Sequence, residues 1–316
     1  GITGRVMTWL HVPGTDYAPA LAEEIDLGVS AAWDLQEVAA AARSTGHIAR
    51  VHLKVDSGLG RGGAYAADFS ALVADARRLQ EQGSVRVVGV WSHFACADEP
   101  GHPSIQAQQD AFDAAVDEVQ AAGCELEVRH LANSAATLTR PSAHYDLVRV
   151  GLAVYGLSPV PQLGQPAAYG LVPAMTLVAR LALVKEVPAG QGVSYGHLYR
   201  TTEATRLGLV PIGYADGIPR HASAVGPLSV AGTRHTIAGR VCMDQVVVDL
   251  GPGSRAQAGD EVVLWGADPA LGPTAQEWAV STGTISYEIV TRLGPRVERV
   301  YRTQQTNQAR QMRKEA

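Results

Sequence analysis

The sequence predicts an α/β fold, a (β/α)8 TIM barrel that is incomplete at its N-terminus, followed by a mostly β C-terminal domain. In the first half, short apolar runs alternate with segments of helical periodicity, the pattern of parallel strands joined by helices. Four polar residues stand at or just after the ends of four different runs, where barrel enzymes assemble their sites. From about residue 171 the pattern changes to β-rich runs broken by Gly and Pro. We therefore expect a barrel portion over 1–170 and a β domain over 171–316.

The first half contains about six predicted strands, whereas a closed barrel needs eight. Asp34 fits an N-cap for the first long helix, and Gly46 fits its terminator. We expect the two missing strand–helix units to belong on the N-terminal side. The predicted strands are 5–10, 25–29, 49–55, 85–91, 126–131 and 145–150, and the predicted helices are 34–43, 67–82, 105–122 and 134–139. The polar residues at strand ends are Lys54, His93, Asn133 and Arg149.

The second half is expected to be built mainly of strands joined by turns. Near its end, Thr274 and Glu277 form a capping box ahead of a helix, and a second helix is expected over 284–293. The polar, basic tail over 302–316 is expected to be disordered. The predicted strands are 175–187, 206–212, 228–231, 236–241, 245–250 and 261–265.

The composition is that of an ordinary globular protein, with 46% hydrophobic and 18% charged residues. A net charge of −5 without charge runs argues against nucleic acid or an anionic membrane as a partner. No apolar stretch approaches the ~20 residues needed to span a bilayer, and the first residues carry no signal-peptide pattern. The three cysteines have no metal-ligand spacing, so we expect no metal site and a cytoplasmic location.

Five short strings carry most of the functional information. Two of them hold a tyrosine between small residues, Val-Ser-Tyr-Gly at 193–196 and Gly-Tyr-Ala-Asp-Gly at 213–217. Tyrosine is an unusual general base because its unperturbed pKa is about 10, so a site that uses one must supply cations or donors to stabilise the phenolate. The other three strings offer such groups: Lys-Val-Asp-Ser-Gly-Leu-Gly-Arg at 54–61, Ser-His-Phe-Ala at 92–95 and Val-Arg-Val-Gly at 148–151.

In this order the five strings resemble alanine racemase, and the resemblance extends from Gly1 to about Tyr301. It implies an enzyme of fold type III that uses pyridoxal 5'-phosphate (PLP) and interconverts L- and D-alanine by two-base proton transfer, supplying D-alanine for peptidoglycan. It also implies a homodimer with shared active sites, in which Tyr195 and Met243 enter the partner's barrel. Two alternatives stay open: a related PLP racemase of wider specificity, for example for serine, and a non-catalytic PLP-binding or dimerising protein.

The resemblance implies three catalytic residues, Tyr195, His93 and Arg149. Tyr195 would be one of the two bases, and His93 would link it to Arg149 in a hydrogen-bond chain that stabilises the phenolate. Arg149 would face the pyridine nitrogen of PLP and keep it neutral, because arginine cannot accept a proton. A neutral ring is a weaker electron sink, which limits transamination and decarboxylation. Taken singly, Arg149 would be half of a salt bridge at a strand end, and His93 a buried histidine bonded to the backbone.

The remaining site residues would contact the substrate and the cofactor. Arg61 and the Met243 backbone would hold the substrate carboxylate. The backbone N–H groups of Gly151 and Leu152 would approach the phosphate, beside a helix that Ser134 caps. Taken singly, Ser134 would be a plain N-cap, Met243 part of a strand end and turn, and Tyr301 a packed surface aromatic. The full set of implied cofactor contacts is Asn133, Ser134, Arg149, Gly151, Leu152, Tyr214 and Tyr301.

Lysine is scarce in this chain, in which Lys54, Lys185 and Lys314 are the only lysines among 26 Lys and Arg residues. Lys54 matches a family lysine that is often carbamylated and that orients the arginine seven residues later, here Arg61. The Schiff-base lysine of the family belongs to a different string, similar to Val-Val-Lys-Ala-Asn-Ala-Tyr-Gly, which does not occur here. We therefore expect the chain as given to be inactive as a racemase.

Overall fold

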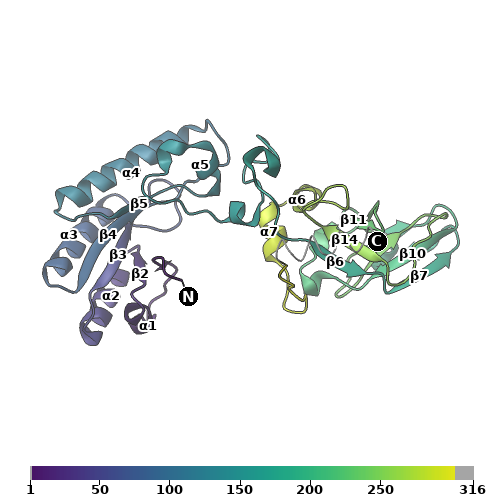
Figure 1. Ribbon diagram of the computed structural model, residues 1–316, viewed down its shortest axis with the longest axis horizontal. Coiled ribbons are helices and arrows are strands. Elements are labelled where there is room, and N and C mark those ends of the chain that lie inside the picture. The colour runs from purple at the N-terminus through teal and green to yellow at the C-terminus, as the bar shows by residue number, and fades with distance from the viewer. Residues whose placement is uncertain (1, 303–316) are drawn as a thin grey trace. The chain divides into compact units, whose positions relative to one another are not determined.

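The computed structural model describes residues 2–302 and divides the chain into two compact units between Leu171 and Val172. The first unit holds a parallel sheet with helices, and the second holds antiparallel sheets with two short helices at its end (Figure 1). The predicted fold class, an α/β barrel portion followed by a mostly β domain, is confirmed. Among the described residues, no helix is long and apolar enough to cross a membrane.

The sheet of the first unit contains five strands in sequential order, and every neighbouring pair is parallel. Sequential parallel strands joined by helices are the arrangement of a (β/α) barrel, of which this sheet forms part. Because parallel strands end at the same edge, residues that follow β3, β4 and β5 come together there. The strands are β1 (Met7–Thr8), β2 (Asp26–Val29), β3 (Ala49–Lys54), β4 (Val85–Trp91) and β5 (Val128–His130).

The helices α2, α3 and α4 line one face of this sheet (Figure 1). Their apolar stripes and the strands form one continuous core, in which Leu35, Leu72 and Phe112 are almost completely buried. Each such side chain contributes about 1.5–3 kcal/mol by leaving water. The helices are α1 (Ala18–Ala22), α2 (Ala32–Thr45), α3 (Ala67–Glu81), α4 (Pro103–Ala121), α5 (Ser134–Thr139) and the short 3₁₀ turns η1 (Pro141–Ala143), η2 (Leu152–Tyr155) and η3 (Pro166–Tyr169).

The strand expected over 145–150 does not form, so the prediction of a sixth strand is wrong. Tyr145 has a φ of +47°, in the left-handed region that a strand cannot contain. Two backbone bonds still hold the segment beside β5, from Asp146 N–H to Arg129 O (3.1 Å) and from Arg149 N–H to Ala132 O (2.9 Å). These two contacts place Arg149 next to the end of β5 without a ladder.

The ends of α2 were predicted only in part. Gly46 terminates the helix as expected, with a φ of +70° and its N–H bonded to Ala42 O. Asp34 is not the N-cap, because the helix begins at Ala32, two residues before the predicted start, and Ala31 is the N-cap. Asp34 is buried in the first turn instead, where its carboxylate accepts hydrogen bonds from Ser30 N–H (3.1 Å) and the Tyr17 hydroxyl (2.9 Å).

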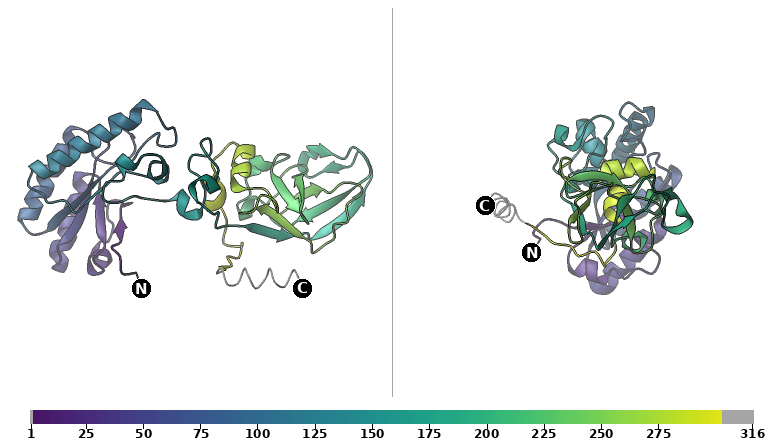
Figure 2. Two further views of the ribbon diagram at one scale, coloured as in Figure 1. Left: turned by 45° about the horizontal axis from the view of Figure 1, so that its top comes forward. Right: turned by 90° about the vertical axis from the view of Figure 1, so that its right-hand side faces the viewer.

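The second unit contains a three-stranded sheet in the order β13-β10-β7, a four-stranded sheet in the order β12-β11-β14-β6, and a β8–β9 pair. Figure 2 shows its strands in shades of green and the two short helices near its end in yellow. The capping box of Thr274 and Glu277 is confirmed at the start of α6. The strands are β6 (Leu177–Arg180), β7 (Leu183–Val187), β8 (Gly192–Val193), β9 (Tyr199–Arg200), β10 (Thr205–Val210), β11 (Pro227–Val230), β12 (Thr233–Thr236), β13 (Val246–Asp249) and β14 (Glu261–Trp265), and the helices are α6 (Ala275–Thr282) and α7 (Ser286–Thr291).

Two strand predictions in this unit are wrong in detail. The run 175–187 is two strands, because Leu181 N–H bonds to Asp260 O while Ala182 N–H bonds to Leu209 O, so the chain passes from one sheet to the other. The run 236–241 is not a strand, and β12 ends at Thr236. The tail predicted to be disordered lies outside the described residues except for Arg302.

Candidate active site

Arg149 is the centre of the polar cluster at the ends of β3, β4 and β5. Its Nη1 donates to His130 Nδ1 (3.0 Å) and to the carbonyl of the same residue (2.8 Å). Its Nη2 donates to the carbonyls of Ser92 and Leu131 and to His93 Nδ1 (3.3 Å). Among the described residues, no carboxylate pairs with Arg149 and no acceptor faces its Nε–H. Burial lowers the pKa of Arg149 to about 10, so the guanidinium is charged at neutral pH.

His93 is a neutral histidine with one fixed donor. Burial, reinforced by the positive charges of Arg149, Arg61 and Lys54, lowers the pKa of His93 to about 4. Because Arg149 can only donate, His93 Nδ1 must be the acceptor of their bond, which leaves the ring proton on Nε2. The site therefore presents an imidazole N–H on a ring that is itself polarised by a cation.

Lys54 is a buried lysine, 8% exposed, at the end of β3. Burial and the neighbouring charges of Arg61 and Arg149 lower its pKa. Its ammonium lies over the Trp91 ring, 4.4 Å from the centroid, and it has no hydrogen bond or ion pair with any described residue. A buried lysine without an acidic partner, beside two arginines, is a cation cluster that fits an anion.

Arg61 stands at the end of a tight loop that Asp56 organises. The Asp56 Oδ1 accepts hydrogen bonds from the N–H groups of Gly58 (3.0 Å), Leu59 (2.9 Å) and Gly60 (3.1 Å). Burial alone would raise the pKa of Asp56, but these backbone donors outweigh it and lower the pKa. The loop is thus fixed while the Arg61 side chain stays exposed.

The Ser134 side chain joins the beginnings of α5 and η2. The prediction that Ser134 caps α5 is wrong: Asn133 is the N-cap, and its Oδ1 accepts from Ala136 N–H (3.0 Å). Ser134 is the first helical residue, and its Oγ accepts from Gly151 N–H (2.9 Å) and more weakly from Ala153 N–H (3.4 Å). The hydroxyl and the Gly151 N–H therefore face each other across the space between two helix N-termini, where donors collect.

The second unit carries Tyr195, Tyr214 and Met243 on loops. Tyr195 follows Ser194, whose φ of +60° turns the chain, and its side chain is 72% exposed. Tyr214 and Met243 are neighbours, because Tyr214 N–H bonds to Cys242 O (3.0 Å) and Ala215 N–H bonds to Met243 O (2.8 Å). Met243 is 60% exposed, and its own N–H makes no hydrogen bond within the described residues. Tyr301 is 91% exposed.

Both halves of the chain match models of one protein family. Residues 1–159 match the alanine racemase N-terminal domain, and residues 174–301 match the alanine racemase C-terminal domain. The alanine racemase of Streptomyces coelicolor is 57% identical over 298 residues, which cover 94% of this chain and 76% of that protein. The chain belongs to the alanine racemase family.

Solved structures of alanine racemases agree with this assignment. The enzyme from D-cycloserine-producing Streptomyces lavendulae is 58% identical, with a TM-score of 0.94 over 96% of this chain and 79% of that one. The Bacillus anthracis enzyme with bound L-Ala-P is 31% identical, with a TM-score of 0.83 over 94% of this chain and 76% of that one. The similarity spans both units of the fold.

Sequence reasoning missed three residues beside this alanine racemase site, Asp26, His52 and His130. All three are at most 4% exposed and lie on β2, β3 and β5. A signal was available, because an aspartate and a histidine inside apolar strands cannot be buried without partners. The sequence pattern does not indicate that His52 bonds to both Asp26 and His130.

Proposed function

We propose that this chain contributes to the interconversion of L- and D-alanine with PLP as cofactor and that Arg149 holds the pyridine nitrogen. The observation that carries the proposal is the arginine itself, charged and half-buried, with both Nη atoms fixed by acceptors and its Nε–H left without one. A neutral pyridine nitrogen could accept the hydrogen bond that the Arg149 Nε–H does not make within the described residues. Bound PLP supplies an electron sink for the electron pair that remains when the α-proton leaves.

The phosphate of PLP binds at the cradle formed by Ser134, Gly151 and Leu152. Ser134 Oγ and Gly151 N–H bond to each other, and both would donate to a phosphate oxygen. Leu152 opens η2, so its N–H has no partner inside that turn. Asn133 fixes the start of α5 beside them. Tyr214 and Tyr301 stay predicted phosphate contacts.

The substrate carboxylate would bind between Arg61 of one subunit and the Met243 N–H of its partner. Arg61 projects from a fixed loop, and the Met243 N–H has no partner among the described residues. A guanidinium and a backbone N–H are both suited to a carboxylate. The same contacts fit serine, so alanine and serine should be compared as substrates.

Tyr195 is one of the two bases, and it acts in the site of the partner subunit of a homodimer. Its exposure of 72% and that of Met243, 60%, suit residues that enter another molecule. In that site the Nε2–H of His93 donates to the phenol oxygen. His93 is in turn held by Arg149, so the cation stabilises the phenolate through one neutral ring.

Lys54 is carbamylated in the working enzyme. Burial and the neighbouring cations lower the pKa of Lys54, which favours its uncharged amine, the form that adds to CO2 to give a carbamate and release a proton. The negative carbamate then pairs with Arg61 and orients it, and the reversal of charge relieves the repulsion among the cations at this site.

None of the lysines described here holds the cofactor covalently, and residues 1–316 alone do not racemise alanine. The carbamate of Lys54 pairs with Arg61, and Lys185 lies on β7 of the second unit. Lys314 lies outside the described residues. We call the chain preceded by a segment with the family's lysine motif the extended chain. In the cytoplasm, it would supply D-alanine for peptidoglycan.

The test is a spectroscopic titration of PLP into wild-type protein, Arg149→Ala and Arg78→Ala. Arg78 is a matched control, because it pairs with Asp75 on the exposed side of α3. Loss of hydrogen bonds to a charged group costs about 1.5–3 kcal/mol, so Arg149→Ala should weaken PLP binding about 10- to 100-fold. Arg78→Ala should leave it unchanged. Equal affinity in all three proteins would remove Arg149 from the cofactor site.

A further inference from the structure

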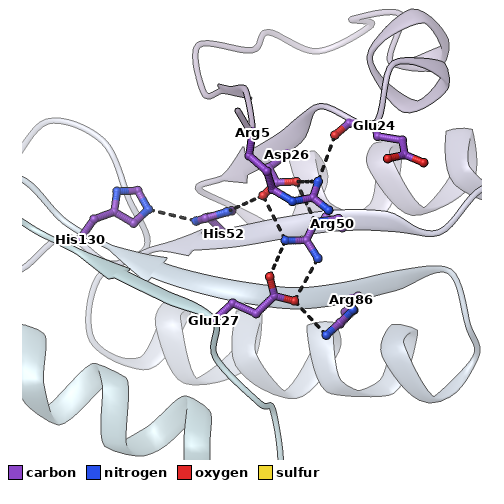
Figure 3. Close-up of polar contacts among 8 residues, drawn as sticks. All are labelled: Arg5, Glu24, Asp26, Arg50, His52, Arg86, Glu127 and His130. Atoms are coloured by element: carbon purple, nitrogen blue, oxygen red, sulfur yellow. Dashed lines mark hydrogen bonds and ion pairs between the residues drawn. The ribbon is translucent and has the colours of Figure 1, made fainter. Parts of the chain in front are cut away.

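A row of buried polar groups runs from Arg149 to the opposite end of the sheet. His130 Nε2 lies 3.0 Å from His52 Nδ1, and His52 Nε2 lies 3.1 Å from Asp26 Oδ2 (Figure 3). Together with the 3.0 Å contact between Arg149 Nη1 and His130 Nδ1, these form one unbroken chain of three hydrogen bonds. Asp26 comes from β2, His52 from β3 and His130 from β5.

The two ends of this chain leave only one arrangement of its protons. A guanidinium can only donate, so His130 Nδ1 accepts and the His130 proton is on Nε2. That proton is donated to His52 Nδ1, which places the His52 proton on Nε2, facing the Asp26 carboxylate. Asp26 can only accept while it is ionised, and its pKa is lowered because hydrogen bonds from His52 and Arg50 outweigh the effect of burial. Every donor thus meets an acceptor.

We propose that Asp26 and His52 are positioning residues for Arg149: they fix the tautomer of His130 so that its Nδ1 holds the guanidinium and leaves Nε–H for the cofactor. This inference rests on the proposed function, since it gives the purpose of the Arg149 orientation. The carboxylate that ends this row of hydrogen bonds lies two rings away from Arg149, and none of the carboxylates in residues 2–302 competes for the donors of Arg149.

Two packing observations show that the fold leaves room for the hydrogen-bonded row of Arg149, His130, His52 and Asp26. Gly89 lies on β4 directly beside His52, and a Cβ on it would come within 2.2 Å of His52 Nδ1. Glycine weakens a strand interior, so its presence here keeps space for the ring. On the other side, Trp91 stacks on His130 with an interplanar angle of 2° and a centroid distance of 5.6 Å, which fixes the plane of that ring.

The far side of Asp26 also determines what an amide would do there. Asp26 Oδ1 accepts from Arg50 Nε (2.8 Å) and Arg5 Nη1 (3.1 Å), whereas Oδ2 accepts from arginine only through a longer bond from Arg50 Nη2 (3.4 Å) (Figure 3). In Asp26→Asn, the amide oxygen stays with the two donors of Oδ1, and the NH2 group faces His52. His52 must then accept at Nε2 and donate from Nδ1, which reverses both rings and brings a His130 N–H against the Arg149 N–H. Exchanging a buried carboxylate for an amide has this tautomer effect in serine proteases, where the geometry stays intact.

Glu127→Gln is the matched control. Glu127 also bonds Arg50, through both of its oxygens, but it touches neither histidine. Its side chain is 37% exposed, against 5% for Asp26. Like Asp26→Asn, Glu127→Gln therefore removes one negative charge that is paired with Arg50. Unlike Asp26→Asn, it changes no hydrogen bond of His52 or His130. Gly89→Ala is a second probe, which displaces His52 without changing any charge.

The experiment records ¹⁵N-histidine and arginine Nε–H resonances of the 316-residue chain, with and without PLP, and the affinity for PLP. In wild type and Glu127→Gln, His52 and His130 should both carry the proton on Nε2, and PLP should shift the Arg149 Nε–H signal. Asp26→Asn should reverse both tautomers and weaken PLP binding about tenfold, the equivalent of one hydrogen bond of about 1.4 kcal/mol. Gly89→Ala should weaken binding similarly.

A proton on Nδ1 of either ring in the wild type would overturn the proposal, and this result does not depend on any variant folding. Reversed tautomers in Asp26→Asn with unchanged PLP affinity and an unchanged Arg149 signal would also overturn it, while the proposed function would stand. If wild-type protein does not bind PLP at all, the proposed function fails, and the tautomers still decide whether the chain orients Arg149.

Discussion

Gly213 is the residue on which the contact between the two loops of the second unit depends. A Cβ at this position would lie 2.4 Å from Cys242 O and 2.5 Å from Met243 O, both backbone atoms that cannot rotate away. We predict that Gly213→Ala separates the two loops and breaks the bonds from Tyr214 N–H and Ala215 N–H. At about 0.5–1.5 kcal/mol for each hydrogen bond, the free energy of unfolding should fall by about 1–3 kcal/mol.

The assay is urea unfolding of Gly213→Ala beside Gly253→Ala. Gly253 is the control because a Cβ there meets nothing within 4 Å. Gly213 has an extended backbone, with φ of −149°, so steric contact alone is tested and not the special conformation of glycine. The extended chain carrying Gly213→Ala should also bind alanine more weakly, since Met243 moves. If both variants unfold at the same urea concentration, the close approach of these loops contributes nothing.

Two further predictions concern the first unit and the dimer. The pKa of His93 is depressed to about 4 in the folded protein, against 6.5 in the unfolded chain, so the unfolded state takes up a proton first as pH falls. The free energy of unfolding is therefore fully retained above pH 6.5 and falls by up to about 3 kcal/mol between pH 6.5 and 4. His93→Asn should flatten the dependence of unfolding free energy on pH in that range, whereas His47→Asn, at an exposed position, should not; parallel curves for wild type and His93→Asn would contradict this. In extended chains, Tyr195→Phe and a variant without the cofactor-holding lysine should each lose at least ~10²-fold in activity, yet random reassembly of the two should restore about a quarter of wild-type racemisation. Mixed dimers without activity would place Tyr195 in its own subunit.

The central strands could be predicted because burial dictates their composition. The run that became β4 is mostly apolar, as a parallel strand covered on both faces must be, and in β3 apolar residues alternate with Arg50, His52 and Lys54. The segment 145–150 has a similar mixture of apolar and polar residues but turns at Tyr145, whose φ is positive. The start of α2 could not be predicted either, because its N-cap, Ala31, has no side chain that could cap a helix.

The site could be predicted as a set of strand-end residues but not as a network. The strand ends indicated Lys54, His93 and Arg149, and the structure brings these three within electrostatic reach of one another. Which residues hold Arg149 depends on register across three strands, which periodicity does not give. His52 and Asp26 were therefore visible only as unexplained polar residues. The capping role of Ser134 was wrong because Asn133, one residue earlier, has the extended backbone that an N-cap requires.

Arg149 should face the pyridine nitrogen of PLP, and the protonation state of that nitrogen is the most direct test of this contact. PLP labelled with ¹⁵N in the ring, bound to the extended chain, should show an unprotonated nitrogen at neutral pH that accepts a hydrogen bond from Arg149 Nε–H. In Arg149→Glu the same nitrogen should become protonated, and racemisation should slow while transamination increases. A protonated ring nitrogen in the wild-type protein, or an identical signal in wild type and Arg149→Glu, would contradict the account.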